Sequence, residues 1–193
     1  MQARSSKRGT GRKGVDAIAL LIQDHKKVKR LLKQLNATTE KAVAHRESLF
    51  KEITNELKIH TELEEQIFYP AYKEAVRKSD EHLYYEAMEE HHLVDVVLPE
   101  IEASDVESEE FAAKAKVLRD LIEHHTEEEE KQMFPKARKA MGTKELAELG
   151  TQIQERKTDL QSGLMTRAAR TAGYAFGAVM SKVSSRNRKK RAA

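Results

Sequence analysis

Histidine and glutamate side chains occupy positions that the hydrophobic pattern assigns to a protein core. His60 and Glu64 lie four residues apart, so in a helix they fall on one face. That face also carries the apolar residues Ile53, Leu57 and Ile67. A buried carboxylate is costly unless another charge compensates it, and a metal ion is the simplest compensating charge where imidazoles lie beside the carboxylate. The pair therefore indicates a buried metal site.

The segment around this pair recurs later in the chain. HTELEEQIFYP, which starts at His60, aligns with HTEEEEKQMFP, which starts at His125, at a constant shift of 65 residues. Glu129 thereby takes the place of Glu64. The duplication predicts a second metal-binding pair with the same spacing.

A second duplication links the segments that precede each of these pairs. HKKV, which starts at His25, aligns with HHLV, which starts at His91, at a shift of 66 residues. The chain therefore consists of two equivalent helix pairs, and a bundle of two such pairs brings four histidines and two glutamates to one level. The predicted metal ligands are His25, His60, Glu64, His91, His125 and Glu129.

Helical geometry separates these residues from polar neighbours of the same type. At about 100° per residue, His125 lies near the centre of the arc of Leu118, Leu121 and Ile122, whereas His124 lies about 100° away. The same reasoning favours Glu129 over Glu128, and the alignment favours His91 over His92. We expect the remaining histidines to be solvated helix-face residues: His45, His82, His92 and His124.

Six ligands, two of them carboxylates that can bridge, suit two metal ions. Two imidazoles and the bridging carboxylates give each ion four protein ligands, and an oxygen bridge makes a fifth. One position on each ion then stays open. Imidazole with carboxylate suits iron, zinc, copper or nickel, whereas Ca²⁺ and Mg²⁺ prefer oxygen. An open position on a redox-active ion permits binding of dioxygen, peroxide or nitric oxide.

Amphipathic helices must position these side chains. Apolar residues recur at three- and four-residue intervals, and the pattern predicts an all-α, up-down-up-down antiparallel four-helix bundle with an extra C-terminal helix and basic tails. Pro70, Pro99 and Pro135 are expected to bend or break the helices. The expected bundle helices are 16–35, 42 to about Pro70, 81–101 and 110–141. The expected parts are a basic disordered tail at 1–14, the bundle at 15–141, an accessory helix at 142–163, and a small-residue helix with a basic tail at 164–193.

Composition narrows the class of protein further. The 193 residues include no Cys, which excludes a disulfide scaffold and thiolate metal ligands, and a cytoplasmic location is the default expectation. No run approaches the ~18 apolar residues of a transmembrane segment. Residues 1–14 contain five basic residues and residues 181–193 contain six, with no acidic residue in either segment. These tails are candidates for a weak polyanion contact.

The ordered set of His and His-x-x-x-Glu motifs resembles the hemerythrin-like HHE cation-binding family. It comprises His25, His60/Glu64, Glu90/His91 and His125/Glu129, and the similarity spans about 15–141. The resemblance implies a four-helix bundle around a non-haem centre of two iron ions, oxo- or hydroxo-bridged, with the six residues as ligands. Zinc or another divalent metal remains an alternative. Members of the family bind oxygen, sense oxygen or iron, or act against peroxide and nitric oxide.

This sequence differs from the oxygen-carrying hemerythrins in two places. Their third helix supplies two histidines four residues apart, whereas here Asp95 follows His91 at that spacing. Their fourth helix supplies a more distant Asp, whereas here the carboxylate is Glu129. These differences argue against an oxygen-storage role. Whether Asp95 or a tyrosine joins the metal site is left open by the sequence.

Three functions fit the sequence. The first is a di-iron protein that binds or senses dioxygen, iron, or oxidative or nitrosative stress. The second is an enzyme that consumes peroxide or nitric oxide at the same centre. The third is an interaction module that the metal stabilises and whose basic tails bind nucleic acid. The oligomeric state is open.

Overall fold

The computed structural model describes the backbone of residues 15–191, and the side chains of residues 15–164 and 166. All regular structure in the described residues is helical. The α-helices are α1 (Ala17–Asn36), α2 (Val43–Leu63), α3 (Tyr69–Ala75), α4 (His82–Glu102), α5 (Glu109–Glu128) and α6 (Phe134–Arg191). The π-helices η1 (Glu64–Phe68) and η3 (Glu129–Met133) and the 3₁₀-helix η2 (Lys78–Asp80) complete the order.

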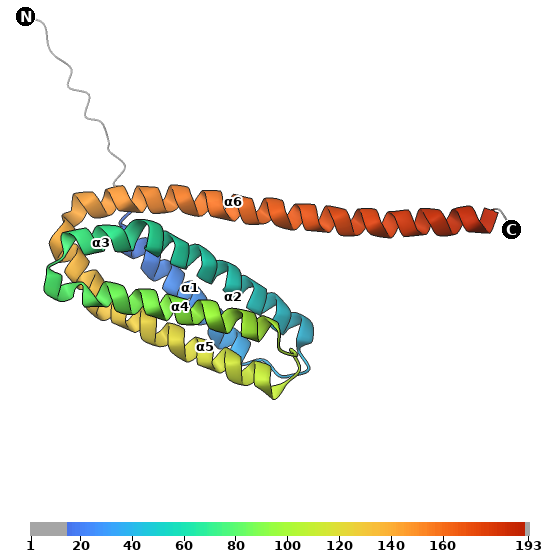
Figure 1. Ribbon diagram of the computed structural model, residues 1–193, viewed down its shortest axis with the longest axis horizontal. Coiled ribbons are helices and arrows are strands. Elements are labelled where there is room, and N and C mark those ends of the chain that lie inside the picture. The colour runs from blue at the N-terminus through green and yellow to red at the C-terminus, as the bar shows by residue number, and fades with distance from the viewer. Residues whose placement is uncertain (1–14, 192–193) are drawn as a thin grey trace, which may run out of the picture. The chain divides into compact units, whose positions relative to one another are not determined.

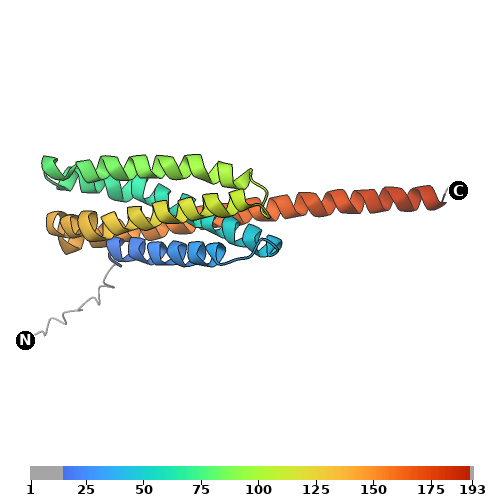
Figure 2. The ribbon, with the colours of Figure 1, turned by 90° about the horizontal axis from the view of Figure 1, so that it is seen from below.

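Four helical segments form an antiparallel bundle, as the sequence predicts (Figures 1 and 2). α1 packs against α2 and α5, and α4 packs against α5. The second segment of the bundle continues from α2 through η1 into α3, and the fourth continues from α5 through η3 into the start of α6. The fold class expected from the apolar periodicity is therefore confirmed.

Side-chain caps and one buried arginine fix where these helices begin. Asp16 accepts a hydrogen bond from Ala19 N at 3.0 Å and so caps α1, while Ser108 Oγ accepts from Phe111 N at 3.1 Å and caps α5. Arg46, on α2, is 4% exposed and donates to Val106 O at 2.6 Å. This contact joins α2 to the link between α4 and α5.

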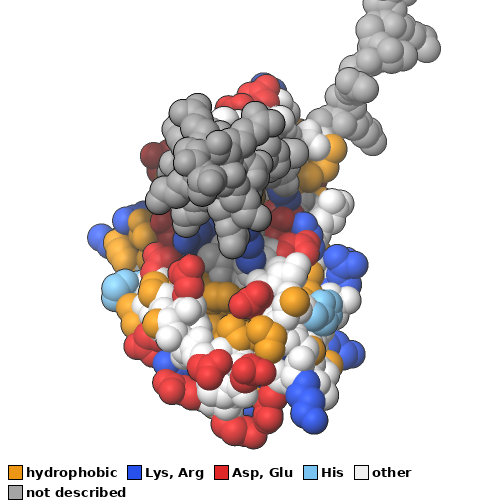
Figure 3. Space-filling view, turned by 90° about the vertical axis from the view of Figure 1, so that its right-hand side faces the viewer, with side chains coloured by type: hydrophobic (Ala, Val, Ile, Leu, Met, Phe, Trp, Pro, Cys, Tyr) orange, Lys and Arg blue, Asp and Glu red, His pale blue; other side chains and the backbone are white. Residues whose placement is uncertain are grey.

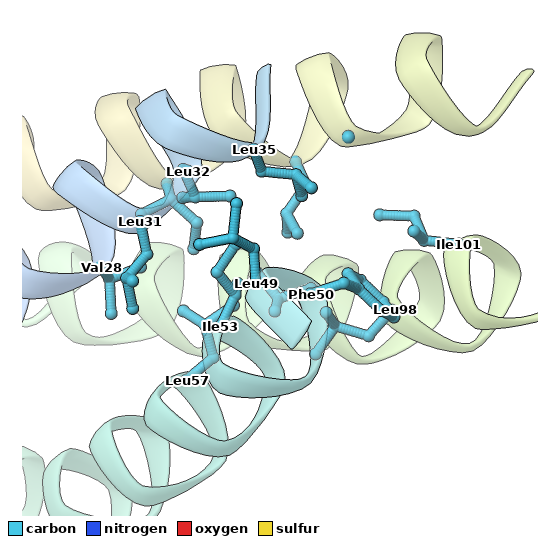
Figure 4. Packing of buried hydrophobic residues seen from close by; sticks show 14 of the residues in the cluster. Val28, Leu31, Leu32, Leu35, Leu49, Phe50, Ile53, Leu57, Leu98 and Ile101 are labelled. Atoms are coloured by element: carbon cyan, nitrogen blue, oxygen red, sulfur yellow. The ribbon is translucent and has the colours of Figure 1, made fainter. Parts of the chain in front are cut away.

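An apolar core fills the end of the bundle that carries the α1–α2 and α4–α5 links. Leu31, Leu32, Ile53 and Ile101 are at most 3% exposed and belong to the cluster of buried side chains drawn in Figure 4. A second group of buried rings fills the opposite end: Phe68, Tyr69, Tyr72 and Phe134. The helix faces that carry the predicted metal ligands lie between these two apolar layers.

The sequence predicts that the prolines bend or break the helices, and the regular α-helix is interrupted by π-helix before two of them. Pro70 lies in the first turn of α3, Pro135 lies in the first turn of α6, and Pro99 lies inside α4. Proline lacks an N–H and its ring clashes with the carbonyl four residues earlier. Before Pro70 and Pro135 the chain adopts π-helix, in which Tyr69 N donates to Glu64 O and Phe134 N donates to Glu129 O.

The chain divides by contacts into a unit of residues 1–154 and a unit of residues 155–193. Within the first unit, α6 is interrupted at Gly142, which has φ 75°. The next turns bury Leu146, Leu149 and Ile153. Gly150 lies so close to the start of α1 that an added Cβ would be 1.8 Å from the Val15 carbonyl oxygen.

The structure describes the two ends of the chain to different extents. In the second unit the backbone is helical to Arg191. The predicted tail at 1–14 lies outside the described residues. None of the described helices is long and apolar enough to cross a bilayer.

Candidate metal centre

The six predicted side chains converge between the two apolar layers of the bundle. His25 comes from α1, His60 from α2, His91 from α4 and His125 from α5, and every one is at most 4% exposed. The two carboxylates begin the two π-helices, at Glu64 and Glu129, and are equally buried. Six polar side chains thus share one buried space.

Each carboxylate lies between imidazoles of different helix pairs. Glu64 Oε2 is 3.2 Å from His60 Nε2 and 3.4 Å from His91 Nε2. Glu129 Oε2 is 3.1 Å from His25 Nε2 and 3.5 Å from His125 Nε2. Each carboxylate therefore contacts imidazoles of both helix pairs.

The ligand atoms form two groups compact enough to hold a cation. One group combines His25 and His60 with both carboxylates, and the other combines Glu64 with His91 and His125. Within each group the nitrogen and oxygen atoms lie within 4.8 Å of one another. Because Glu64 belongs to both groups, the geometry fits two neighbouring ions.

Several of these atoms are buried without a hydrogen bond. They are His25 Nε2, His60 Nε2, Glu64 Oε1 and Glu129 Oε2. They lie 3.1–3.8 Å from other polar atoms of the centre but without hydrogen-bond geometry. A buried polar atom without a partner is costly, and lone pairs that face one another are satisfied by a cation. The donor set and its burial therefore fit a metal centre.

The π-helices bring Tyr69 into the centre. In an α-helix, residues five apart point about 140° away from each other, so Tyr69 would face away from Glu64. The i to i+5 turn of η1, in which Tyr69 N donates to Glu64 O, puts both side chains on one face. Tyr69 Oη donates to Glu129 Oε1 at 2.9 Å and lies 3.3 Å from His91 Nε2. Tyr69 is fully buried.

Phe134 takes the place of Tyr69 in the second half of the repeat. Its ring stacks on His25 with the centroids 5.7 Å apart, as the Tyr69 ring packs on His91 at 5.4 Å. Phenylalanine supplies no hydroxyl. The two cation groups are therefore similar in ligands but differ in this one neighbouring oxygen.

Two imidazoles are held in the protonated form by the glutamates around them. Burial alone would lower the pKa of His25, but its close contacts with Glu129, Glu130 and Glu64 outweigh burial and raise the pKa well above the ordinary value. Burial likewise opposes the charge on His91, and contacts with Glu64 and Glu65 raise its pKa to about 10. In the metal-free protein these protons balance part of the buried negative charge.

His60 and Tyr69 are shifted toward their neutral forms instead. Burial lowers the pKa of His60 to about 3, against the attraction of Glu64 and with the repulsion of the other histidines. Burial and the neighbouring carboxylates raise the pKa of Tyr69 well above its usual range. The Tyr69 hydroxyl therefore keeps its proton and donates it to Glu129.

A small cavity adjoins the imidazoles on the side of the apolar core. It has a volume of about 10 Å³, close to what one water molecule needs. Its walls consist of the four histidines and the side chains of Val28, Leu57, Thr61, Ile122 and Thr126. A ligand of two or three atoms is the largest that fits without movement of these walls.

The other candidates from the sequence lie outside this centre. Asp95 is exposed on α4. His45, His82 and His92 are exposed, and His124 is 64% exposed, as expected for solvated helix-face residues. His124 belongs to a third, surface group with Glu90 and Glu128. Tyr69 is the residue that helical periodicity could not place, since the period changes at Glu64.

A helical bundle that buries histidines and glutamates between its helices is the architecture of a cation-binding domain. Residues 16–137 match the family model of the hemerythrin HHE cation binding domain, and the chain belongs to this family. A solved structure of a hemerythrin HHE cation binding domain-containing protein, an Rv2633c homolog from Mycobacterium kansasii, superposes with a TM-score of 0.69. Its sequence is 25% identical, over 79% of this chain and 91% of that one.

A curated relative with a different description also matches. It is a DNA nickase from Nostoc sp. (strain PCC 7120), 24% identical over 156 residues. The match takes in 81% of this chain but 43% of the relative. More than half of the nickase therefore has no counterpart in the present sequence.

Proposed function

We propose that the chain holds two iron ions, oxo- or hydroxo-bridged, and that it binds or senses dioxygen, peroxide or nitric oxide. His25 and His60 would hold one ion, His91 and His125 the other, and Glu64 and Glu129 would bridge them. The observation that carries the proposal is the set of buried Nε2 and carboxylate oxygens that face one another without hydrogen bonds. Zinc fits the same ligands, so the metal is part of what must be tested.

Bound iron would supply redox chemistry and an open coordination position. The surrounding residues would control access to it. The apolar walls of the cavity, Val28, Leu57 and Ile122, exclude all but small uncharged ligands. Tyr69 keeps the proton on its hydroxyl and donates it to Glu129, which holds this carboxylate in place beside the imidazoles. We place this centre in the cytoplasm. None of its ligands is a thiolate, because the chain contains no Cys.

Rapid mixing of the anaerobic ferrous protein with each small molecule tests this function. We expect dioxygen, peroxide or nitric oxide to change the absorption spectrum. Val28→Ile, which adds a methylene group to the cavity wall, should slow the reaction at least severalfold. Val94→Ile makes the same change at a core position that does not line the cavity and should leave the rate unchanged.

The outcome also separates a sensor from an enzyme. Steady-state consumption of peroxide or nitric oxide over many turnovers would assign the alternative function, an enzyme at the same centre. A single spectral change without turnover supports binding or sensing. No spectral change with any of the three molecules would contradict both.

The similarity to a DNA nickase favours a second candidate, nucleic-acid binding. Six basic residues lie in 181–193 and five in 1–14, without an acidic residue in either segment. The bundle itself offers little to a polyanion at the α4–α5 link. Six exposed acids lie between residues 100 and 110, and two of them, Glu100 and Glu110, form ion pairs with a basic residue, Lys114. Acidic side chains gather on the face shown in Figure 3.

Salt-dependent DNA binding tests this candidate. The full chain should bind duplex DNA with an affinity that falls steeply with salt, and a chain lacking residues 1–14 and 181–193 should not. Equal binding by both chains would contradict a role for the tails.

A further inference from the structure

Each imidazole of the candidate centre has a carboxylate on the nitrogen that faces away from the centre. His25 Nδ1 is 3.0 Å from Glu130 Oε1, His91 Nδ1 is 2.9 Å from Glu65 Oε1, and His125 Nδ1 is 2.7 Å from Glu90 Oε2. His60 Nδ1 is 4.0 Å from Asp24 Oδ2. All four Nε2 atoms are left to face inward. We call these four acids the outer carboxylates.

The outer carboxylates follow the internal repeat of the sequence. Each is the chain neighbour of an inner residue, in the doublets Asp24-His25, Glu64-Glu65, Glu90-His91 and Glu129-Glu130. Asp24 aligns with Glu90 at the shift of 66 residues, and Glu65 aligns with Glu130 at the shift of 65. A duplicated acid next to four of the six predicted ligands makes an accidental surface acid a poor explanation.

Each outer carboxylate contacts a histidine on another bundle segment. Asp24 and Glu90 reach the second histidine of their own helix pair, His60 and His125. The contacts of Glu65 and Glu130 cross from one helix pair to the other. The four contacts therefore connect all the segments that supply imidazoles.

The chemical consequence is the same at the three contacts within hydrogen-bond distance, those of Glu130, Glu65 and Glu90, whereas the 4.0 Å between Asp24 and His60 is an ion-pair contact only. A carboxylate on Nδ1 accepts the Nδ1 proton, fixes the tautomer with the lone pair on Nε2, and sets the orientation of the ring. It also makes the imidazole a stronger donor to a cation, because it stabilises the positive charge that binding places on the ring. Glu130 is additionally bound by Lys29 Nζ at 3.0 Å, which keeps it ionised.

Resting on the metal centre proposed above, we propose that Asp24, Glu65, Glu90 and Glu130 are positioning residues that orient the four imidazoles and strengthen their binding to cations. The contribution to cation affinity should differ among the four outer carboxylates. Aspartate is one methylene shorter than glutamate, and its contact with His60 is correspondingly longer, at 4.0 Å. The glutamates therefore contribute more than Asp24.

Zn²⁺ affinity, measured on the full chain by competition with a chromophoric chelator, tests this proposal. Glu90→Gln retains an oxygen that accepts the His125 proton but removes the charge. We expect Glu65→Gln, Glu90→Gln and Glu130→Gln to weaken binding by about 10- to 100-fold each, and Asp24→Asn by less. Glu89→Gln is the matched control, since it removes the same charge from an exposed neighbour on α4. The Zn²⁺ affinity of Glu89→Gln should stay within twofold of that of the unsubstituted protein.

A spectroscopic readout separates positioning from a general loss of stability. The absorption bands of the Co²⁺-loaded protein should shift in Glu90→Gln and not in Glu89→Gln, while circular dichroism shows both folded. Equal affinities and spectra for these two variants, in a parent that binds two ions, would overturn the positioning role and leave the metal centre intact. A parent that binds no ion, or a His60→Ala/His125→Ala variant that binds as well as the parent, would overturn the metal centre and this inference together.

Discussion

Replacing Tyr69 by phenylalanine removes a single oxygen from the middle of the candidate centre. The hydroxyl has one proton and donates it to Glu129 at 2.9 Å. The ring itself should stay in place, because the repeat already carries a phenylalanine, Phe134, at the equivalent position. The perturbation is thus confined to one hydrogen bond with a buried carboxylate.

The magnitude follows from the charge and burial of the acceptor. A hydrogen bond to a charged group contributes about 1.5–3 kcal/mol. We therefore expect Tyr69→Phe to lower the free energy of unfolding of the metal-free protein by about 2 kcal/mol. For a chain of this length that corresponds to a midpoint lower by about 4–8 °C. Because the raised pKa keeps Tyr69 protonated, the loss should be the same between pH 6 and 9.

Urea unfolding followed by far-ultraviolet circular dichroism measures this difference. Tyr72→Phe is the matched control, since Tyr72 Oη donates to a neutral acceptor, the Asp80 carbonyl oxygen, at 3.2 Å. Its loss should cost about 0.5–1.5 kcal/mol. A cost for Tyr69→Phe no larger than that for Tyr72→Phe would refute the reasoning that a buried, charged carboxylate depends on this hydroxyl.

Other predictions concern the metal, the pH and the backbone. Removing metal should lower the melting temperature, since free metal at 100 times its dissociation constant stabilises the fold by about 2.7 kcal/mol; calorimetry with and without chelator would show this, and equal midpoints would contradict it. Metal affinity should fall from pH 8 to pH 6, because the raised pKa values of His25 and His91 mean that metal displaces protons there; pH-independent affinity would exclude that competition. Gly150→Ala should destabilise the protein, because its Cβ would meet the Val15 carbonyl at 1.8 Å; an unchanged urea midpoint would argue against this close packing. Gly142→Ala should cost about 1–2 kcal/mol in the same assay, because φ is 75° there; no cost would contradict a left-handed residue.

The sequence was sufficient for the fold and for the grouping of the six side chains. Apolar periodicity defines the helices to within a few residues. The internal repeat then distinguishes His91 and His125 from their neighbours, and the structure brings both of these histidines into the buried centre. Both predictions depend on local sequence alone. Helical periodicity determines which residues share a face, and the internal repeat indicates which faces are equivalent.

The surroundings of the centre could not be predicted in the same way. The period of 3.6 fails at Glu64 and Glu129, where the chain turns into π-helix, and every side chain beyond these points is rotated. Tyr69 was therefore indistinguishable from the tyrosines that only pack. Proline marks where the α-helix is disturbed near Pro70 and Pro135, but the π-helical form of the preceding turns has no simple sequence signature.

Metal content together with the absorption spectrum of the air-exposed protein tests the central claim most directly. The parent should contain about two iron ions per chain and show oxo-bridged ferric absorption in the near ultraviolet. The His60→Ala/His125→Ala variant should lose both while circular dichroism shows it folded. Little iron in a well-folded parent, unchanged by these substitutions, would contradict the di-iron account.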